Sequence, residues 1–301
     1  MQKITPFLWF DREAEEAAKF YTSAFKNSKL GKIAYYGKEG YEVHKMTAGT
    51  VMTAEFTIEG MKFAALNGGP IFKFNPSLSF HVAAKSVDEV DKLWKILSEG
   101  GSVLMELGSY PFSRRYGWLQ DRYGLSWQIF YVGEREIIQK ITPVLMFVGK
   151  VSGKAEEAVT FYTTVFHRAK VASIQRYGKG ELPDEEGTVK YASLVLENMQ
   201  FGAMDSAHGH KFSFNEAVSF LVECENQKEV DYFWDKLSAS PEDEQCGWLK
   251  DKYGLSWQIV PKQLDEFMGD PDPVKAGRVM EVMLKMKKIS IGELEKAYRA
   301  G

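Results

Sequence analysis

Cysteine is scarce in this chain, which has only two among its 301 residues, Cys224 and Cys246. The two lack CxxC spacing, so they do not form the usual redox or metal-binding motif. We therefore interpret them as two reduced thiols, which is the usual state of cysteine in a cytoplasmic protein.

Long apolar runs and clustered positive charge are also missing. No run approaches the roughly 18 apolar residues of a membrane span, and Met1-Gln2-Lys3 does not begin a secretory signal. The net charge is −3, with lysine and arginine spread along the sequence. A basic groove for nucleic acid is therefore not indicated. We expect a cytoplasmic protein whose partners include neither membrane nor nucleic acid.

Two familiar catalytic patterns are absent. The sequence contains no Gly-x-Ser-x-Gly, and neither cysteine has a matched histidine, so a nucleophilic triad is not supported. The only glycine-rich candidate for binding S-adenosylmethionine is Gly178-Lys179-Gly180. It precedes Pro183 and an acidic loop, whereas such a cofactor needs a turn from a strand into a helix. The sequence therefore argues against methyl transfer.

The most informative feature that is present is a duplication. The stretch from Gly117 to Ile129 recurs from Gly247 to Ile259 with eleven of thirteen positions identical. Chance does not produce such a match, so the chain consists of two copies of one unit. A chain of 301 residues can form two domains that each bury a core.

The hydrophobic pattern predicts the order β-α-β-β-β and then β-α-β-(β)-β in each copy. Asp11 is the expected cap of the first helix, and a strand of the first copy is shortened to a loop in the second, between Ser238 and Trp248. In the first copy we expect strands at 4–10, 29–36, 43–58, 61–67, 78–84 and 102–107, and helices at 11–25 and 87–97. The counterparts in the second copy are strands at 141–147, 189–196, 199–205 and 218–222 and a helix at 155–166.

The residues after the second copy have a different pattern. Asp272 and Pro273 are a cap and a first-turn proline, and Ser290 with Glu293 forms a capping box for a last helix. A methionine-rich stripe lies between them, which is more typical of packing than of function. We expect two helices that dock on a domain or on a partner subunit.

Several of these motifs together resemble the PhnB-like family. They are an Ile-Thr-Pro opening strand, a Glu-Ala…Phe-Tyr helix, Phe-Asn before the fifth strand, a Val-Asp…Trp helix and the ending Gly-Trp-Leu-x-Asp-x-Tyr-Gly-Leu-Ser-Trp-Gln. That family belongs to the vicinal oxygen chelate superfamily, with glyoxalase, bleomycin-resistance proteins and extradiol dioxygenases. Some of its members carry the label 3-demethylubiquinone 3-methyltransferase.

The resemblance implies an α+β fold of tandem vicinal-oxygen-chelate domains. Each domain is made of paired βαβββ modules that form a curved sheet around a cup, and C-terminal helices follow. The domains implied are residues 1–134 and 139–262, with a helical tail at 263–301. Members of the superfamily bind a metal or a small molecule in the cup.

The resemblance also gives positions for a metal. Superfamily enzymes take ligands from the first, fifth and eighth strands, commonly two histidines and a glutamate. The fifth-strand and eighth-strand positions fall here on Ser79 and Gln128 in the first copy and on Ser219 and Gln258 in the second. The first-strand position falls on Thr5 or Pro6, and on Thr142 or Pro143. Serine, proline and an amide are poor ligands, so we expect no catalytic metal and no cofactor.

His81 complicates this expectation. It lies two residues after Ser79, on the same face of the strand, and is able to act as a metal ligand or general base or to form a hydrogen bond within the cup or at an interface. The second copy has Leu221 there. His208-Gly209-His210 has chelate spacing, but solvated loop histidines are the simpler interpretation.

We expect the protein to bind a small organic molecule in an aromatic-lined cup, with no assignable reaction, and a homodimer is compatible with this. Asn67 and Asp205 are either polar contacts at a cup mouth or turn formers. One alternative is a metal-dependent lyase, isomerase or dioxygenase that uses His81, and another is a non-catalytic scaffold. The candidate pocket residues are Trp9, Asn67, Ser79, His81, Trp118, Gln128, Phe130, Asp205, Ser219, Trp248 and Gln258.

Overall fold

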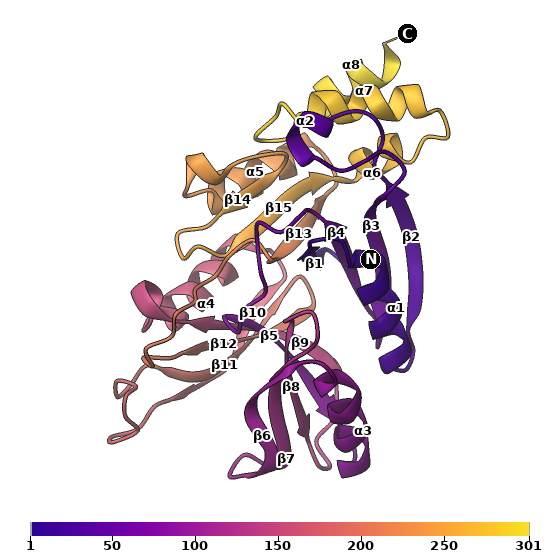
Figure 1. Cartoon of the computed structure of the whole chain (residues 1–301). Coiled ribbons are helices and arrows are strands. Elements are labelled where there is room, and N and C mark those ends of the chain that lie inside the picture. The colour runs from indigo at the N-terminus through magenta and orange to yellow at the C-terminus, as the bar shows by residue number, and fades with distance from the viewer. Residues whose placement is uncertain (1, 301) are drawn as a thin grey trace.

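Two curved mixed sheets form the centre of the molecule in a computed structural model that describes residues 2–300 (Figure 1). Sheet A has the strand order β14 (Trp248–Lys250), β15 (Ser256–Pro261), β13 (Val218–Cys224), β1 (Ile4–Phe10), β4 (Met61–Asn67), β3 (Val51–Ile58) and β2 (Lys29–Tyr35). Sheet B has the order β10 (Ala169–Arg176), β11 (Val189–Leu196), β12 (Met199–Asp205), β9 (Ile141–Phe147), β5 (Leu78–Ala84), β8 (Ser126–Tyr131), β7 (Ser113–Gln120) and β6 (Ser102–Tyr110). We call their concave faces cup A and cup B.

Each sheet combines strands from both repeats. Strand β1 of the first repeat pairs antiparallel with β13 of the second, and β5 of the first pairs antiparallel with β9 of the second. The loops before β5 and β13 also exchange hydrogen bonds, from Asn75 to the Ser213 carbonyl at 3.0 Å and from Asn215 to the Lys73 carbonyl at 2.8 Å. Each cup is therefore completed within one chain, by half of each repeat.

Helices cover the convex faces of both sheets. On sheet A, α1 packs against β3 and β4 and α5 packs against β15 and β13, while on sheet B α3 lies on β7 and β8 and α4 lies on β11. No helix among residues 2–300 is long and apolar enough to span a membrane. The helices are α1 (Ala14–Ala24), α2 (Tyr41–His44), α3 (Val87–Ser98), α4 (Ala155–Val165), α5 (Gln227–Leu237), α6 (Lys262–Met268), α7 (Pro273–Met283) and α8 (Ile291–Arg299).

Most predicted elements are confirmed, with two local corrections. Strand β3 begins at Val51 and not at residue 43, because residues 41–44 form α2 and Gly49 adopts φ +86°, which interrupts an extended chain. Helix α1 begins at Ala14 without a cap from Asp11. The Asn67 side chain, at the end of β4, accepts a hydrogen bond from the Ala14 amide at 2.8 Å instead.

The tail completes the edge of sheet A, where the second repeat lacks a counterpart of β6. The amides of Cys246 and Gly247 donate to the carbonyls of Met286 and Lys287, each at 2.8 Å. These are contacts that a neighbouring strand would make. Helices α7 and α8 start at the predicted caps, Asp272 and Ser290. The tail was expected to dock on a domain or on a partner subunit, and in the structure it docks on the second repeat of its own chain.

A buried aspartate lies at the centre of each copy of the duplicated stretch. In the first copy, Asp121 Oδ2 accepts hydrogen bonds from the Tyr21 hydroxyl at 2.7 Å and from the Trp127 indole at 2.8 Å. Its Oδ1 accepts from the amides of Tyr123 at 2.9 Å and Leu125 at 3.1 Å. Because Tyr21 belongs to α1 on sheet A and Trp127 to β8 in sheet B, the aspartate joins the two halves of a repeat.

The second repeat builds the same arrangement around Asp251. Its carboxylate accepts from the Tyr162 hydroxyl at 2.7 Å and the Trp257 indole at 2.9 Å, and from two amides of the following turn. Both aspartates are 3% exposed, so neither can exchange these donors for water. Four donors on one buried carboxylate satisfy the charge without a basic partner.

Replacing Asp121 by asparagine is predicted to lower the free energy of unfolding by about 3 kcal/mol, because the amide NH₂ would face two N–H or O–H donors. Asp251→Asn should have a similar effect, and urea unfolding measures both. Asp91→Asn is the matched control, since Asp91 forms a half-exposed ion pair with Arg115 and should cost less than about 1 kcal/mol. Equal small effects at all three positions would contradict the structural role of the buried aspartates.

Candidate functional site

Strand alternation separates the residues that face each cup from those beneath the helices. In sheet B, the large side chains Phe80 and Trp127 are fully buried on the helix side. The register places Thr142, His81, Gln128 and Trp118 side by side on β9, β5, β8 and β7. These four residues form one cross-strand row on the floor of cup B.

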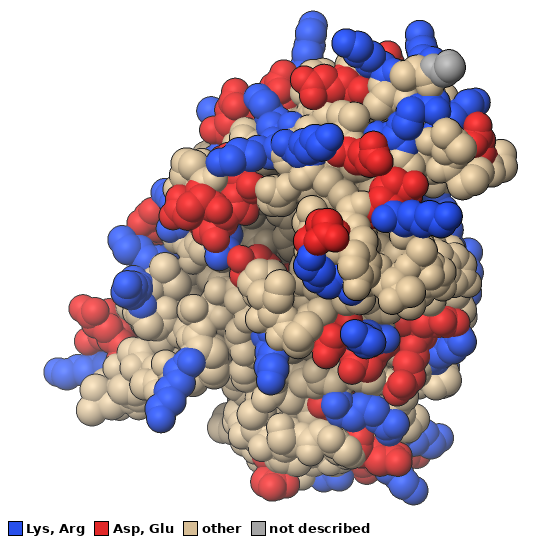
Figure 2. Space-filling model, turned by 45° about the horizontal axis from the view of Figure 1, so that its top comes forward, with Lys and Arg blue, Asp and Glu red and all other residues tan. Residues whose placement is uncertain are grey.

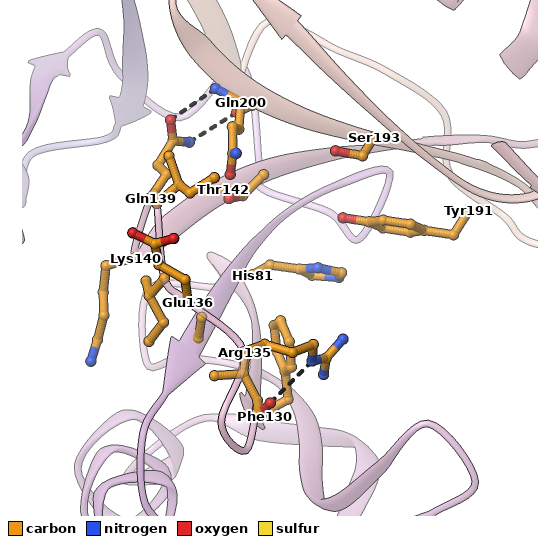
Figure 3. A pocket seen from close by; sticks show the side chains of 14 residues that line it. His81, Phe130, Arg135, Glu136, Gln139, Lys140, Thr142, Tyr191, Ser193 and Gln200 are labelled. Carbon is orange, nitrogen blue, oxygen red and sulfur yellow. Dashed lines mark hydrogen bonds between the residues drawn. The ribbon is translucent and has the colours of Figure 1, made fainter. Parts of the chain in front are cut away.

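Cup B contains a cavity of about 180 Å³ beside this row (Figure 3). One wall is the segment of residues 132–140, which connects the two repeats. Gln139 fixes that segment to β12 by donating to the Gln200 carbonyl at 2.9 Å and accepting from the Gln200 amide at 2.8 Å. The other walls are His81, Phe130, Thr142, Tyr191, Ser193 and Gln200.

His81 is held between two aromatic rings. Tyr191 stacks on it with ring centres 5.6 Å apart and planes 2° from parallel, and Phe130 meets it edge-on at 5.3 Å. Its Nε2 atom is buried and has no hydrogen-bond partner. A buried polar atom without a partner costs free energy, and a hydrogen-bond donor beside it would recover that cost.

Gly202 allows Tyr191 to reach His81. A Cβ atom at Gly202, on β12, would lie 2.8 Å from the Tyr191 hydroxyl and 2.9 Å from a methyl group of Val144. The corresponding position of cup A is Ala64, and the counterpart of Tyr191 on β3 is the shorter Thr53. Glycine is therefore needed where the tyrosine lies across the sheet.

The positions expected for metal ligands bind each other. Gln128 donates to Ser79 Oγ at 2.8 Å and accepts from the Tyr116 hydroxyl at 2.7 Å, while in cup A Gln258 donates to Ser219 Oγ at 2.9 Å. Among residues 2–300 no three His, Cys, Asp or Glu side chains are grouped so that they could hold a metal ion. These neutral, mutually paired side chains do not fit the metal of the superfamily enzymes.

Cup A has the same row with different chemistry. Thr5, Leu221, Gln258 and Trp248 take the places of Thr142, His81, Gln128 and Trp118. Trp9 and Trp248 meet edge-on at 5.9 Å. Trp9, a candidate from the first copy, lies with residues of the second copy, because β1 pairs with β13.

Asn67 and Asp205 do not face the cups. Each is buried on the helix side at the end of its strand, where it caps the helix of its own repeat. Asp205 accepts from the Ala155 amide at 3.0 Å and from the Val189 amide at 2.9 Å. Both residues therefore organise the backbone around them. The expectation that Asn67 and Asp205 contact a ligand at a cup mouth is wrong.

The histidine pair after β12, His208 and His210, makes its hydrogen bond and its ring contact within its own loop. His210 Nε2 lies 2.9 Å from Ser206 Oγ, and its ring centre is 5.9 Å from that of His208. Residues Tyr191, Ser193 and Gln200 were missed as pocket residues. Their alternation on β11 and β12 could have placed them on a concave face, but the sequence does not show which repeat supplies that face.

Comparison with known proteins gives a consistent family assignment. The sequence model of the family described as 3-demethylubiquinone-9 3-methyltransferase matches residues 2–130 and again residues 139–260. A putative 3-demethylubiquinone-9 3-methyltransferase, PhnB protein, from Bacillus cereus is 41% identical, covering 44% of this chain and 100% of that one, with a TM-score of 0.40. No curated protein matches.

A solved glyoxalase I from Zea mays has the same fold. It is 12% identical, covers 89% of this chain and 95% of its own length, and has a TM-score of 0.54. Gly178-Lys179-Gly180, the glycine-rich candidate for S-adenosylmethionine, lies in the loop between β10 and β11, and the next element after it is a strand and not a helix. On the two family matches, the chain belongs to the PhnB-like 3-demethylubiquinone-9 3-methyltransferase family of the vicinal oxygen chelate superfamily.

Proposed function

We propose that this protein binds a planar, single-ring organic molecule with a polar substituent in cup B. The observation that carries the proposal is the cavity lined by the His81 ring, whose buried Nε2 atom has no hydrogen-bond partner. A hydroxyl or amine group of the ligand would pair with that nitrogen. The ring of the ligand would pack among the aromatic side chains beside His81.

The size of the cavity limits the ligand. A closed apolar cavity of about 150 Å³ accommodates benzene, and cup B offers about 180 Å³. One ring with a small substituent fills that volume, whereas a nucleotide or an intact S-adenosylmethionine is too large for it. The binding requires no second chain, because cup B is complete within one.

The charge around His81 favours a neutral ligand. Burial lowers the pKa of His81 to about 4, with a smaller opposing effect from Gln128. The imidazole is therefore uncharged at neutral pH. Lys140, at the cavity wall, is already paired with Glu89. Arg135 and Glu136 also line the wall, and their opposite charges leave it without a net charge.

The two alternative functions have weaker support. An imidazole with a pKa near 4 is poorly matched to act as a general base at neutral pH. For a metal site, Glu136 is the one carboxylate beside His81 among the described residues of the cavity wall, which include no second histidine. A scaffold with vestigial cups is expected to fill them with side chains, and cup B has a cavity. Binding of a neutral ring is the function that these features support best.

Isothermal titration with phenol and toluene tests the polar contact. Wild-type protein should bind phenol about fivefold more tightly than toluene, the effect of one net hydrogen bond of about 1 kcal/mol. His81→Leu, which copies Leu221 of cup A, should remove this preference while still binding toluene. The control Leu221→Met changes the matching position of cup A and should leave both affinities unchanged. Equal binding of the two probes by wild type, or an unchanged preference in His81→Leu, would refute the proposal.

The pH dependence of stability tests the state of His81. Its folded pKa of about 4 lies below the ordinary value of 6.5, so the unfolded chain takes up a proton that the folded protein cannot. Stability from this group is present above pH 6.5 and is lost as the pH falls towards 4, by up to about 3 kcal/mol. The free energy of unfolding should therefore fall more steeply over this range in wild type than in His81→Leu. Parallel curves would mean that the histidine is not held neutral.

A further inference from the structure

Cup A carries acidic residues at positions whose counterparts in cup B are uncharged and line its cavity. The cross-strand rows align Glu55 with Ser193, and Glu223 with Ala83. Ala54, Phe56, Val222 and Cys224 are buried on the helix side, so alternation directs both carboxylates to the concave face. Figure 2 shows a recess beneath the C-terminal helices, with both acidic and basic residues around it.

The lysines near cup A are largely committed to other acids. Lys250 contacts Glu216 at 2.8 Å and Asp243 at 3.1 Å, and Lys32 contacts Asp265 at 3.1 Å. Partial burial raises the pKa of Glu55; Asp265 and Glu223 add to this and Lys32 and Lys62 oppose it. Lys62 lies two residues from Ala64 on β4, so alternation places it on the same concave face, where it is exposed. It is one free amine against the two carboxylates Glu55 and Glu223. The concave face therefore holds more carboxylate than amine that is free to balance it.

An aromatic cluster lies on the same face. Trp248 meets Phe7 at 5.8 Å and Trp9 at 5.9 Å between ring centres, and both pairs are edge-on. In cup B the counterparts of Phe7 and Trp9 are Val144 and Met146. Phe7 and Glu55 both pair with Ala64, one from each side. They are therefore two strand spacings apart, about 10 Å along the sheet.

An unpartnered hydroxyl provides an independent indication of a ligand in cup A. Ser256 is 1% exposed and its Oγ has no hydrogen-bond partner. It lies in the cross-strand row of Ser219 and Phe7 and faces the cup. In cup B the equivalent Ser126 accepts a hydrogen bond from the Trp118 indole at 2.8 Å. Trp248 packs on Phe7 and Trp9 instead, which leaves Ser256 unsatisfied.

We propose that cup A is a second binding site, for an organic cation such as a quaternary or protonated amine with an attached ring. The cation would lie between Glu55 and the faces of Phe7 and Trp9. Carboxylate charge and aromatic faces both stabilise such a group. Displacement of Trp248 by the ring would return its indole to Ser256, as Trp118 is bonded in cup B. The two repeats thus provide sites for ligands of different charge.

Titration with benzyltrimethylammonium, compared with its neutral isostere neopentylbenzene, tests this proposal. Wild type should bind the cation at least fivefold more tightly than the isostere. Glu55→Gln should weaken cation binding at least fivefold, and Glu223→Gln should also weaken it. Neither change should alter binding of the isostere. Raising the salt concentration from 0.05 to 0.5 M should weaken binding of the cation and not of the isostere, because the Debye length shortens.

Matched variants in cup B separate the two sites. Ser193→Ala, at the counterpart of Glu55, and His81→Leu should leave the affinity for benzyltrimethylammonium unchanged, while Glu55→Gln should leave phenol binding unchanged. Equal affinity for cation and isostere, or no effect of Glu55→Gln, would overturn the proposal. It would also be overturned if His81→Leu, and not Glu55→Gln, weakened cation binding, because the cation would then lie in cup B.

Discussion

The buried aspartate of each repeat is the interaction on which the rest of the structure depends. A carboxylate placed between an apolar helix and a strand is costly unless its lone pairs are filled, and four donors fill those of Asp121. This requirement fixes Tyr21 of α1 relative to the turn that enters β8. The same turn sets the register of β8, and so directs Gln128 and Phe130 into cup B. Asp251 imposes the same geometry on β15 and Gln258 of cup A.

The duplication and the exchange of strands have different consequences. The cores follow the repeats, because each aspartate joins two halves of one repeat. The cups follow the sheets, because β1 joins β13 and β5 joins β9. A substitution on a concave face therefore changes one wall of one cup and leaves the other cup unaffected. This arrangement permits His81 with Tyr191 in one cup, and Leu221 with Glu55 in the other, on nearly identical scaffolds.

Much of the fold could be predicted from the sequence, because it follows from local periodicity and from repetition. The hairpin at Glu59 and Gly60 is an example, since both residues adopt the positive φ angles expected of its turn. Cap residues were less predictable: Asp11 precedes α1 in sequence, yet Asn67, which is 53 residues from Ala14, supplies the hydrogen bond. Pairing between repeats was not predictable, since antiparallel partners within and between copies have the same hydrophobic pattern. The neighbours of Trp9 therefore come from the second repeat, whereas the shared face of Ser79 and His81 follows from strand alternation alone.

The central claim is that strands of the first repeat and strands of the second repeat together form a binding site at His81, in cup B. A crystal soaked with 4-bromophenol tests it most directly, because the anomalous signal of bromine locates the ring without bias. The account predicts one strong bromine peak in cup B, with the phenol oxygen within hydrogen-bond distance of His81 Nε2 and the ring in contact with Phe130 or Tyr191. A bromine peak only outside cup B, or a ring in cup B whose oxygen avoids His81, would contradict it.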